Sequence, residues 1–204
     1  MQFLTEADIR AMRLADGATL LLPAGTELGP LALEYCRQRG MQIERTKPEH
    51  MTHLHSNVLV PKTHPRICLR GKLDSLQALI LLAAQQAKAD TRPDIAGSLE
   101  EFYSFAQMIL RCEVKEEPLP AFTLLGLGSA GLRHASHHPE KFAGMPHPVP
   151  HNGMPPLALA LNYLRTQIRE TELCAVEAER PDLIEALNRF SSAVYLLFLK
   201  VLSA

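Results

Sequence analysis

Apolar residues recur at helical spacing over most of the chain beyond residue 60. Long segments of this kind begin at about Thr63, Pro93, Pro156 and Pro181, with Thr63 as the expected N-cap of the first. A proline lies at or near each start, a position where its missing N–H does not weaken a helix. A shorter segment covers 127–136. The pattern therefore predicts an all-α fold, a helical bundle of about five helices.

The first 46 residues follow a different pattern. ATLLLPAGTEL predicts a strand that leads into a turn, GPLALEYCRQRG predicts a helix that ends at Gly40, and MQIER predicts a second short strand. We expect a small N-terminal α+β appendage over 1–46, with a structural or targeting role. The polar stretch KPEHMTHLHSN predicts a linker over 47–57, and the bundle is expected over 58–204.

Six prolines lie between Pro139 and Pro156. Proline lacks the N–H that regular structure uses, so this segment predicts a long ordered loop or a lid.

The 204 residues are 47% hydrophobic and carry a net charge of −1. A protein without a basic field does not attract nucleic acid or anionic membrane, so an anionic ligand must be held by a local cluster of Lys and Arg. The four cysteines form no CxxC pair, the apolar runs are too short for a membrane span, and MQFLTEADIR lacks the character of a signal peptide. We expect a soluble cytoplasmic protein with no nucleic-acid or membrane partner.

Two motifs suggest ligands but lack their usual context. LLGLGSAGLR contains GxGxxG, yet no strand precedes it and no acidic residue lies between Lys141 and Arg169 to hold a ribose. We interpret its glycines as a flexible entry to a helix. The nine histidines surround the linker and the Pro-rich segment without the compact spacing of a metal site, so we expect no protein metal ligands.

Two of the expected helices carry a polar stripe in otherwise apolar sequence. The stripes consist of Asn162, Arg165, Arg169 and Glu172 in LNYLRTQIRETE, and of Asn188, Ser191, Ser192 and Tyr195 near the C-terminus. Spacings of three and four place each set on one helical face. Such stripes are solvated faces, or sources of helix–helix hydrogen bonds, or two walls that meet across a cleft or a subunit boundary.

A third polar cluster lies in VPKTHPRICLRGKLD, where Lys62, Arg66 and Arg70 are close together and Asp74 continues the face of the two arginines. One interpretation is a solvated face with an Arg–Asp pair, which stabilises a helix by only about 0.2–0.5 kcal/mol. The other is a polyphosphate cradle, because guanidinium groups bind phosphate oxygens bidentately.

The blocks VPKTHPRICLRGKLDSLQALI, LNYLRTQIRETE and RPDLIEALNRFSSAVYLLF occur in that order. Together they resemble the ATP:cobalamin adenosyltransferases of the helical-bundle type. SHHPEKFAGMPHPVP and the N-terminal segment are similar to the ethanolamine-utilization branch of that family. The resemblance implies transfer of the 5′-deoxyadenosyl group of ATP to cobalt: a reduced Co(I) corrinoid attacks the 5′ carbon and triphosphate leaves.

The resemblance also implies roles for particular residues. Lys62 matches a lysine near the ATP phosphates, Arg165 and Arg169 match paired arginines, and Glu172 matches their acidic partner. Asp74 matches an acid that pairs with an arginine of a neighbouring subunit, which here would be Arg165. Asn188 matches a ribose- or phosphate-contacting asparagine, with Arg189 beside it. The expected catalytic residues are Arg169, Arg165 and Asp74, and the expected ligand-binding residues are Lys62, Arg66, Arg70, Arg165, Arg169, Glu172, Asn188 and Arg189.

The ligands that the resemblance implies are ATP as co-substrate and cobalamin as substrate, with Mg²⁺ as the expected divalent metal. It further implies a homotrimer, with a dimer as the alternative, and microcompartment or ethanolamine ammonia-lyase partners in the cytoplasm. Two departures keep other functions open. EHMTHLHSN replaces the family's Thr/Gly-rich ATP loop, and the branch's Cys-rich metal cluster has no counterpart. The alternatives are a non-catalytic corrinoid- or nucleotide-binding or delivery module of a microcompartment, and a plain helical scaffold.

Overall fold

The computed structural model describes residues 2–23, 25–56 and 58–203 and divides the chain into two compact units, Met1–Lys62 and Thr63–Ala204. Four positions lie outside the described residues. Among them, Ala24 belongs to the predicted strand–turn and Asn57 ends the predicted linker. The predicted limits 1–46, 47–57 and 58–204 stay a prediction.

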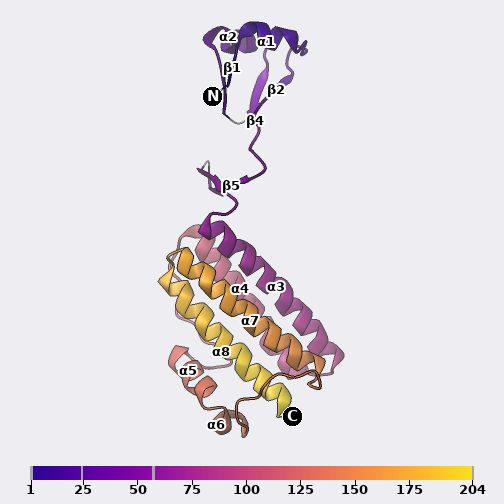
Figure 1. Cartoon of the computed structure of the whole chain (residues 1–204), viewed down its shortest axis with the longest axis vertical. Coiled ribbons are helices and arrows are strands. Elements are labelled where there is room, and N and C mark those ends of the chain that lie inside the picture. Colours follow the sequence, from indigo (N-terminus) through magenta and orange to yellow (C-terminus); the bar gives the residue numbers. More distant parts are fainter. Residues whose placement is uncertain (1, 24, 57, 204) are drawn as a thin grey trace. The chain divides into compact units, whose positions relative to one another are not determined.

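Four long helices form the body of the second unit: α3 (Pro65–Ala89), α4 (Pro93–Lys115), α7 (Pro156–Glu177) and α8 (Pro181–Leu202). Helix α3 packs on α4 and α7, and α8 packs on α7 and on α4, so the four enclose one core (Figure 1). All four long helices were expected at these places, and each begins with proline at its first turn. Thr63 is not the N-cap of α3: His64 is, and its Nδ1 accepts from Arg66 N at 3.3 Å.

The core of the bundle is aliphatic with an aromatic centre. Phe102 and Phe105 of α4 both meet Phe190 of α8 edge to face, with ring centroids 5.3 Å apart in each pair. On α7, Leu161, Leu164 and the other buried residues recur at spacings of three and four. This buried stripe turns the adjacent polar stripe of α7 away from the core.

The two helical hairpins close with the same turn. TRPD joins α3 to α4 and ERPD joins α7 to α8, and Thr91 and Glu179 both take left-handed φ angles, of 56° and 54°. In the first, Arg92 N donates to Ala87 O; in the second, Arg180 N donates to Ala175 O. These six-to-one bonds terminate each first helix, and the proline that follows begins the next.

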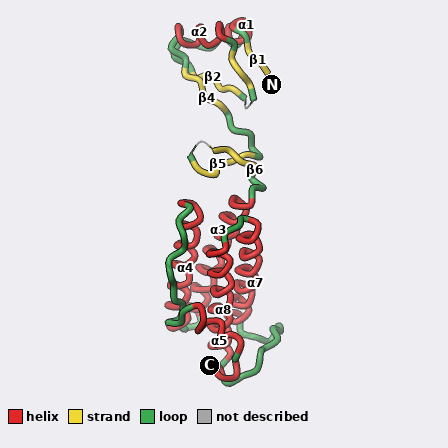
Figure 2. The backbone as a smooth tube through the Cα atoms, turned by 90° about the vertical axis from the view of Figure 1, so that its left-hand side faces the viewer, coloured by secondary structure: helices red, strands yellow, loops and turns green. Residues whose placement is uncertain are grey.

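The connection from α4 to α7 contains two short helices, α5 (Ser129–His137) and α6 (Pro139–Ala143), which both contact α8. The expectation of no regular structure from Pro139 onward was therefore wrong at its start, because Pro139 occupies the first turn of α6, where proline is tolerated. The remainder, up to α7, is loop (Figure 2). Before α5, Leu124 and Leu127 exchange two backbone hydrogen bonds around a tight turn in which Gly126 has φ of 73°. Gly128 is the N-cap of α5, as the helix-entry interpretation expects.

The first unit is α+β, as predicted. Strand β1 (Gln2–Leu4) pairs in parallel with β3 (Thr26–Leu28), and β2 (Thr19–Leu22) pairs in parallel with β4 (Gln42–Arg45). Helices α1 (Glu6–Ala11) and α2 (Pro30–Gln38) pack together beside them, over a small core that includes Leu20, Leu22 and Cys36. Strands β1 and β3 and helix α1 were not among the expected elements.

The stretch expected to be a linker contains β5 (Met51–His55), which pairs antiparallel with β6 (Val58–Pro61). Threonine and valine favour extended backbone, and the polar histidines that suggested a linker alternate with apolar residues along β5. All four cysteines are free thiols. Within the described residues, no helix combines the length and the apolar character that a membrane crossing requires.

Candidate functional site

The polar stripes of α7 and α8 line one cavity of about 480 Å³. Arg165 and Arg169 come from α7, and Asn188 and Tyr195 come from α8. The full lining consists of Ser136, His137, His147, Arg165, Arg169, Asn188, Ser191, Ser192 and Tyr195. Arg165 and Arg169 of the α7 stripe and all four residues of the α8 stripe thus face one space, as the interpretation of two walls expects.

Arg165 is a half-buried cation in an unusual environment. Its Nη2 donates to Asn162 Oδ1 at 3.2 Å, and its guanidinium carbon lies 5.9 Å from the centre of the Tyr195 ring. Its Nε is buried and has no hydrogen-bond partner within the described part of the chain. Burial, and then the charge of Arg169, lower the pKa of Arg165. A bound anion would relieve both effects.

Among its described lining residues this cavity has two guanidinium groups and no carboxylate. Like charges that share a partly desolvated space repel each other, so the arrangement favours an anionic occupant. The cavity can therefore hold a polyanion such as a triphosphate.

Asn188 links this cavity to two neighbouring ones. Its Nδ2 donates to Glu172 Oε1 at 2.9 Å, which ties the two stripes together. Glu172 and Arg169 line a space of about 440 Å³, and Glu172 and Arg189 line one of about 540 Å³. Glu172 thus meets Asn188, and its predicted part in orienting the arginines stays a prediction.

A residue of α5 holds Arg189 beside the space of about 540 Å³ that it lines. Its Nε donates to Ser129 Oγ at 3.1 Å, and that hydroxyl donates to Glu185 Oε1 at 2.7 Å. The Ser129 hydroxyl thus lies between the guanidinium and the carboxylate, and Arg189 shares the space of about 540 Å³ with both Glu172 and Glu185.

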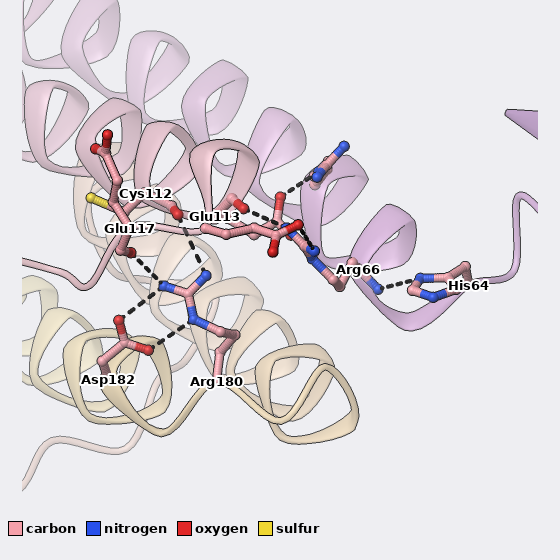
Figure 3. Close-up of polar contacts among 9 residues, drawn as sticks. His64, Arg66, Cys112, Glu113, Glu117, Arg180 and Asp182 are labelled. Carbon is pink, nitrogen blue, oxygen red and sulfur yellow. Dashed lines mark hydrogen bonds and ion pairs between the residues drawn. The ribbon is translucent and has the colours of Figure 1, made fainter. Parts of the chain in front are cut away.

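Arg66 and Arg70 lie elsewhere, at the junction of α3 with the end of α4 (Figure 3). Arg66 Nε donates to Glu113 Oε1 at 2.6 Å, and Arg70 Nε donates to the other oxygen of the same carboxylate. Arg66 also binds Glu116 Oε1 at 2.5 Å. The guanidinium groups are thus engaged by carboxylates and do not line the cavity of Arg165. Their predicted phosphate cradle stays a prediction that these contacts do not favour.

The same junction holds the start of α8. Arg180 Nη2 donates to Glu117 O at 3.0 Å and to Asp182 Oδ2 at 2.9 Å (Figure 3). Asp182 Oδ2 also accepts from Leu119 N at 3.0 Å. Arg180 lowers the pKa of Asp182 to about 2, since the charged carboxylate is the form it binds. These contacts fix the chain where it leaves α4.

Asp74 and Lys62 are the remaining predicted residues. Asp74 is exposed on α3. Lys62 is the last residue of the first unit, and its backbone N–H donates to His50 O at 2.8 Å. The pairing of Asp74 with Arg165 and the contact of Lys62 with phosphate stay predictions.

Sequence reasoning did not assign Ser136, His137 or His147 to the site. His147 lies in the loop between α6 and α7, and its Nδ1 is 2.6 Å from Tyr195 Oη. The available signal was the block SHHPEKFAGMPHPVP, whose histidines were interpreted only as loop residues. Glu113 was also missed, although it follows the buried Ile109 by one helical turn.

A protein metal site is not evident. Among the residues that the structure describes, no group of three or more His, Cys, Asp or Glu side chains could hold a metal ion. The described side chains therefore offer no cage of three or more such ligands, and no chemistry below depends on a metal.

Comparison with known proteins gives a consistent picture. Residues 42–201 match the family model described as cobalamin adenosyltransferase. The corrinoid adenosyltransferase EutT of Escherichia coli (strain K12) is 30% identical over 97% of this chain and 91% of its own length. The corrinoid adenosyltransferase EutT of Salmonella typhimurium is 34% identical over 81% of this chain and 62% of its own length. No solved structure gives a significant match.

Proposed function

The chain belongs to the cobalamin adenosyltransferase family, and from this premise we propose that it transfers the 5′-deoxyadenosyl group of ATP to the cobalt of cob(I)alamin. We place this activity in ethanolamine utilization, as the similarity to two EutT proteins suggests. The observation that carries the proposal is the cavity in which Arg165 and Arg169 meet without a carboxylate among its described lining.

The reaction makes limited demands on the protein. Co(I) supplies the electron pair of the new Co–C bond, the bond from C5′ to the phosphate oxygen breaks, and triphosphate leaves with the electron pair of that broken C–O bond. No proton is transferred at the reacting carbon, so no general base is required. The protein must hold two ligands in line and stabilise charge on the leaving group.

The residues of the cavity suit those demands. Arg169 and Arg165 would bind the triphosphate, and the buried Nε of Arg165 offers a donor with no other partner in the described chain. Asn188, held by Glu172, would contact the ribose or a phosphate, and Arg189 would flank it. Donors fixed before the reaction favour the transition state, because they need no reorganisation as charge develops.

The bundle supplies the rigid frame for this site. We propose that the four long helices together with α5 are its catalytic body, and that Asp74 pairs with Arg165 of a neighbouring subunit in a homotrimer. The exposure of Asp74 and the apolar exposed residues Leu173 and Val176 of α7 support an assembly. We further propose that the protein binds components of a microcompartment, or ethanolamine ammonia-lyase, in the cytoplasm.

Absorbance spectroscopy tests the activity directly. The full-length protein is mixed under anaerobic conditions with ATP and chemically reduced cob(I)alamin, with and without Mg²⁺, and the corrinoid spectrum is followed as the Co–C bond forms. Turnover above the protein-free rate is expected. Folded protein that leaves the spectrum unchanged in both conditions would refute the proposal.

The alternative is a non-catalytic corrinoid- or nucleotide-binding module. It is favoured by the stretch EHMTHLHSN, part of which forms β5 and which the resemblance sets at the position of the family's Thr/Gly-rich ATP loop. It predicts saturable binding of ATP or cobalamin in calorimetry with no spectral change on mixing. The plain-scaffold interpretation predicts no heat with either ligand.

A further inference from the structure

His147 is the one residue of the long α6–α7 connection among the described residues that line the Arg165 cavity. Its ring lies nearly parallel to that of Tyr195, with centroids 5.7 Å apart and an interplanar angle of 24°. Its Nδ1 is joined to Tyr195 Oη by the 2.6 Å hydrogen bond. Because Nδ1 is used in this way, Nε2 is the ring nitrogen that can meet a ligand.

Tyr195 also contacts Arg165, one of the two arginines of the cavity. The guanidinium carbon of Arg165 lies 5.9 Å from the ring centre, within the range of a cation–π interaction. Behind it, the Phe198 ring packs against Tyr195 with a centroid distance of 6.2 Å. One fixed aromatic ring thus sets the place of both a guanidinium and an imidazole.

Charged and titratable groups of several helices surround His147. Arg165 and Arg169 of α7 are positive, His137 of α5 lines the same cavity, and Tyr195 of α8 is its direct partner. On α6, Glu140 is the negative group close enough to affect Tyr195. In an empty cavity the two guanidinium groups oppose a third positive charge, whereas a polyanion between them reverses that effect.

We propose that His147 is a third anion-binding residue of this cavity, and that Tyr195 is a positioning residue for both His147 and Arg165. When a triphosphate group enters, His147 takes up one proton from solvent. Nδ1–H then donates to Tyr195 Oη and Nε2–H donates to a phosphate oxygen. This inference rests on the proposed function, since it assigns a further contact to the triphosphate of the same site.

Inorganic tripolyphosphate is the probe, titrated calorimetrically into the full-length protein at several pH values between about 6 and 8, where histidine titrates. Two buffers of different ionisation enthalpy count the protons taken up. His147→Asn keeps a hydrogen-bonding group near the place of Nδ1 but has none at Nε2. His147→Gln reaches the place of Nε2 but cannot take a proton. His151→Gln, in the same loop but outside the cavity lining, is the matched control.

At about pH 6 the Asn variant should bind the probe about tenfold more weakly than the wild type, because it lacks one charged hydrogen bond. The Gln variant should show a smaller loss, and both should lose the uptake of one proton. Tyr195→Phe, which keeps the ring, should reduce proton uptake and affinity together. The His151 variant should match the wild type. Any proton that tripolyphosphate itself takes up or releases on binding contributes equally to all the proteins compared.

The role of His147 is overturned if the Asn and Gln variants keep wild-type affinity and proton uptake at about pH 6. It is also overturned if the wild type forms the Co–C bond but does not bind tripolyphosphate, which leaves the proposed function intact. Loss of affinity and of proton uptake in the two variants of a protein that forms no Co–C bond supports His147 and refutes the function alone.

Discussion

Arg66 of α3 and Glu113 of α4 are joined twice. The guanidinium Nε donates to Oε1 of the carboxylate at 2.6 Å, and Nη2 donates to the backbone oxygen of the same residue at 2.7 Å. The Glu113 side chain has 0% exposure, and Arg70 binds its second oxygen. Two cations therefore surround one carboxylate that water does not reach, at the point where the first turn of α3 meets the last turn of α4.

Glu113→Gln should destabilise the fold strongly. It removes the negative charge while leaving two guanidinium side chains that are each only 16% exposed, a change that in comparable buried pairs costs about 3–5 kcal/mol. Glu116→Gln is the matched control: it also loses a contact with Arg66, but its side chain is 53% exposed, so the loss should be below about 1 kcal/mol. Urea unfolding followed by circular dichroism measures both. Equal effects would show that burial does not set the strength of this contact.

Arg169→Ala should lower the adenosylation rate by about a hundredfold or more while the fold survives. The reason is that a fixed donor aimed at developing charge contributes mainly in the transition state. Arg111→Ala, on an exposed position of α4, is the matched control and should keep full activity. Steady-state rates measured with saturating cob(I)alamin separate the two. If Arg169→Ala turns over at the wild-type rate, Arg169 is not the triphosphate ligand.

Asp74→Asn should loosen the oligomer or weaken ATP binding, because the proposed partner of Asp74 is Arg165 of a neighbouring subunit. Light scattering over a dilution series measures the first effect, and calorimetry with ATP measures the second. Asp90→Asn, at the other end of α3, where the carboxylate binds Gln86 Nε2, is the control. The pairing is refuted if the Asp74 variant matches the control in both measurements.

The long helices could be predicted because apolar residues recur at helical spacing within each of these segments. The stripe of Leu161, Leu164 and Ile168 specifies which face of α7 is buried, and proline with the residues before it specifies where the helices begin. The short elements could not be predicted in the same way. Helix α6 and strand β5 have too few residues for a pattern to outweigh the histidines and prolines around them.

The candidate site divides along the same line. Arg165 and Arg169 could be placed together because one helix carries both, and Asn188 could be placed opposite them because its stripe is equally regular. His147 could not, since only the tertiary fold of a loop brings it to Tyr195. The acidic partner of Arg66 and Arg70 could not be predicted for a related reason. Local spacing suggested Asp74, whereas α4 supplies the buried Glu113 from more than forty residues away.

The repeated RPD turns give a pH prediction. Asp182 has a pKa of about 2 because Arg180 and the Leu119 N–H stabilise its charged form, and this lowering makes the folded state favour the carboxylate. A depressed carboxyl pKa contributes stability that is fully present above the unfolded value of 3.8 and is lost as pH falls towards 2. The free energy of unfolding of the wild type should therefore fall by about 2 kcal/mol more than that of Asp182→Asn between about pH 5 and pH 2.

Asp94 is the internal control, because it occupies the same place in the other turn and its pKa is also about 2, owing first to Arg92. Its side chain is 40% exposed against 30% for Asp182, and no backbone N–H from another segment is among its causes. Solvent screens the ion pairs of Asp94 more strongly, so Asp94→Asn should reduce the pH dependence of the free energy of unfolding less than Asp182→Asn does. In 1 M salt, most of the pH dependence that Asp94 contributes should disappear. If the two variants change the pH profile equally in high salt, the contact of Asp182 with Leu119 adds nothing.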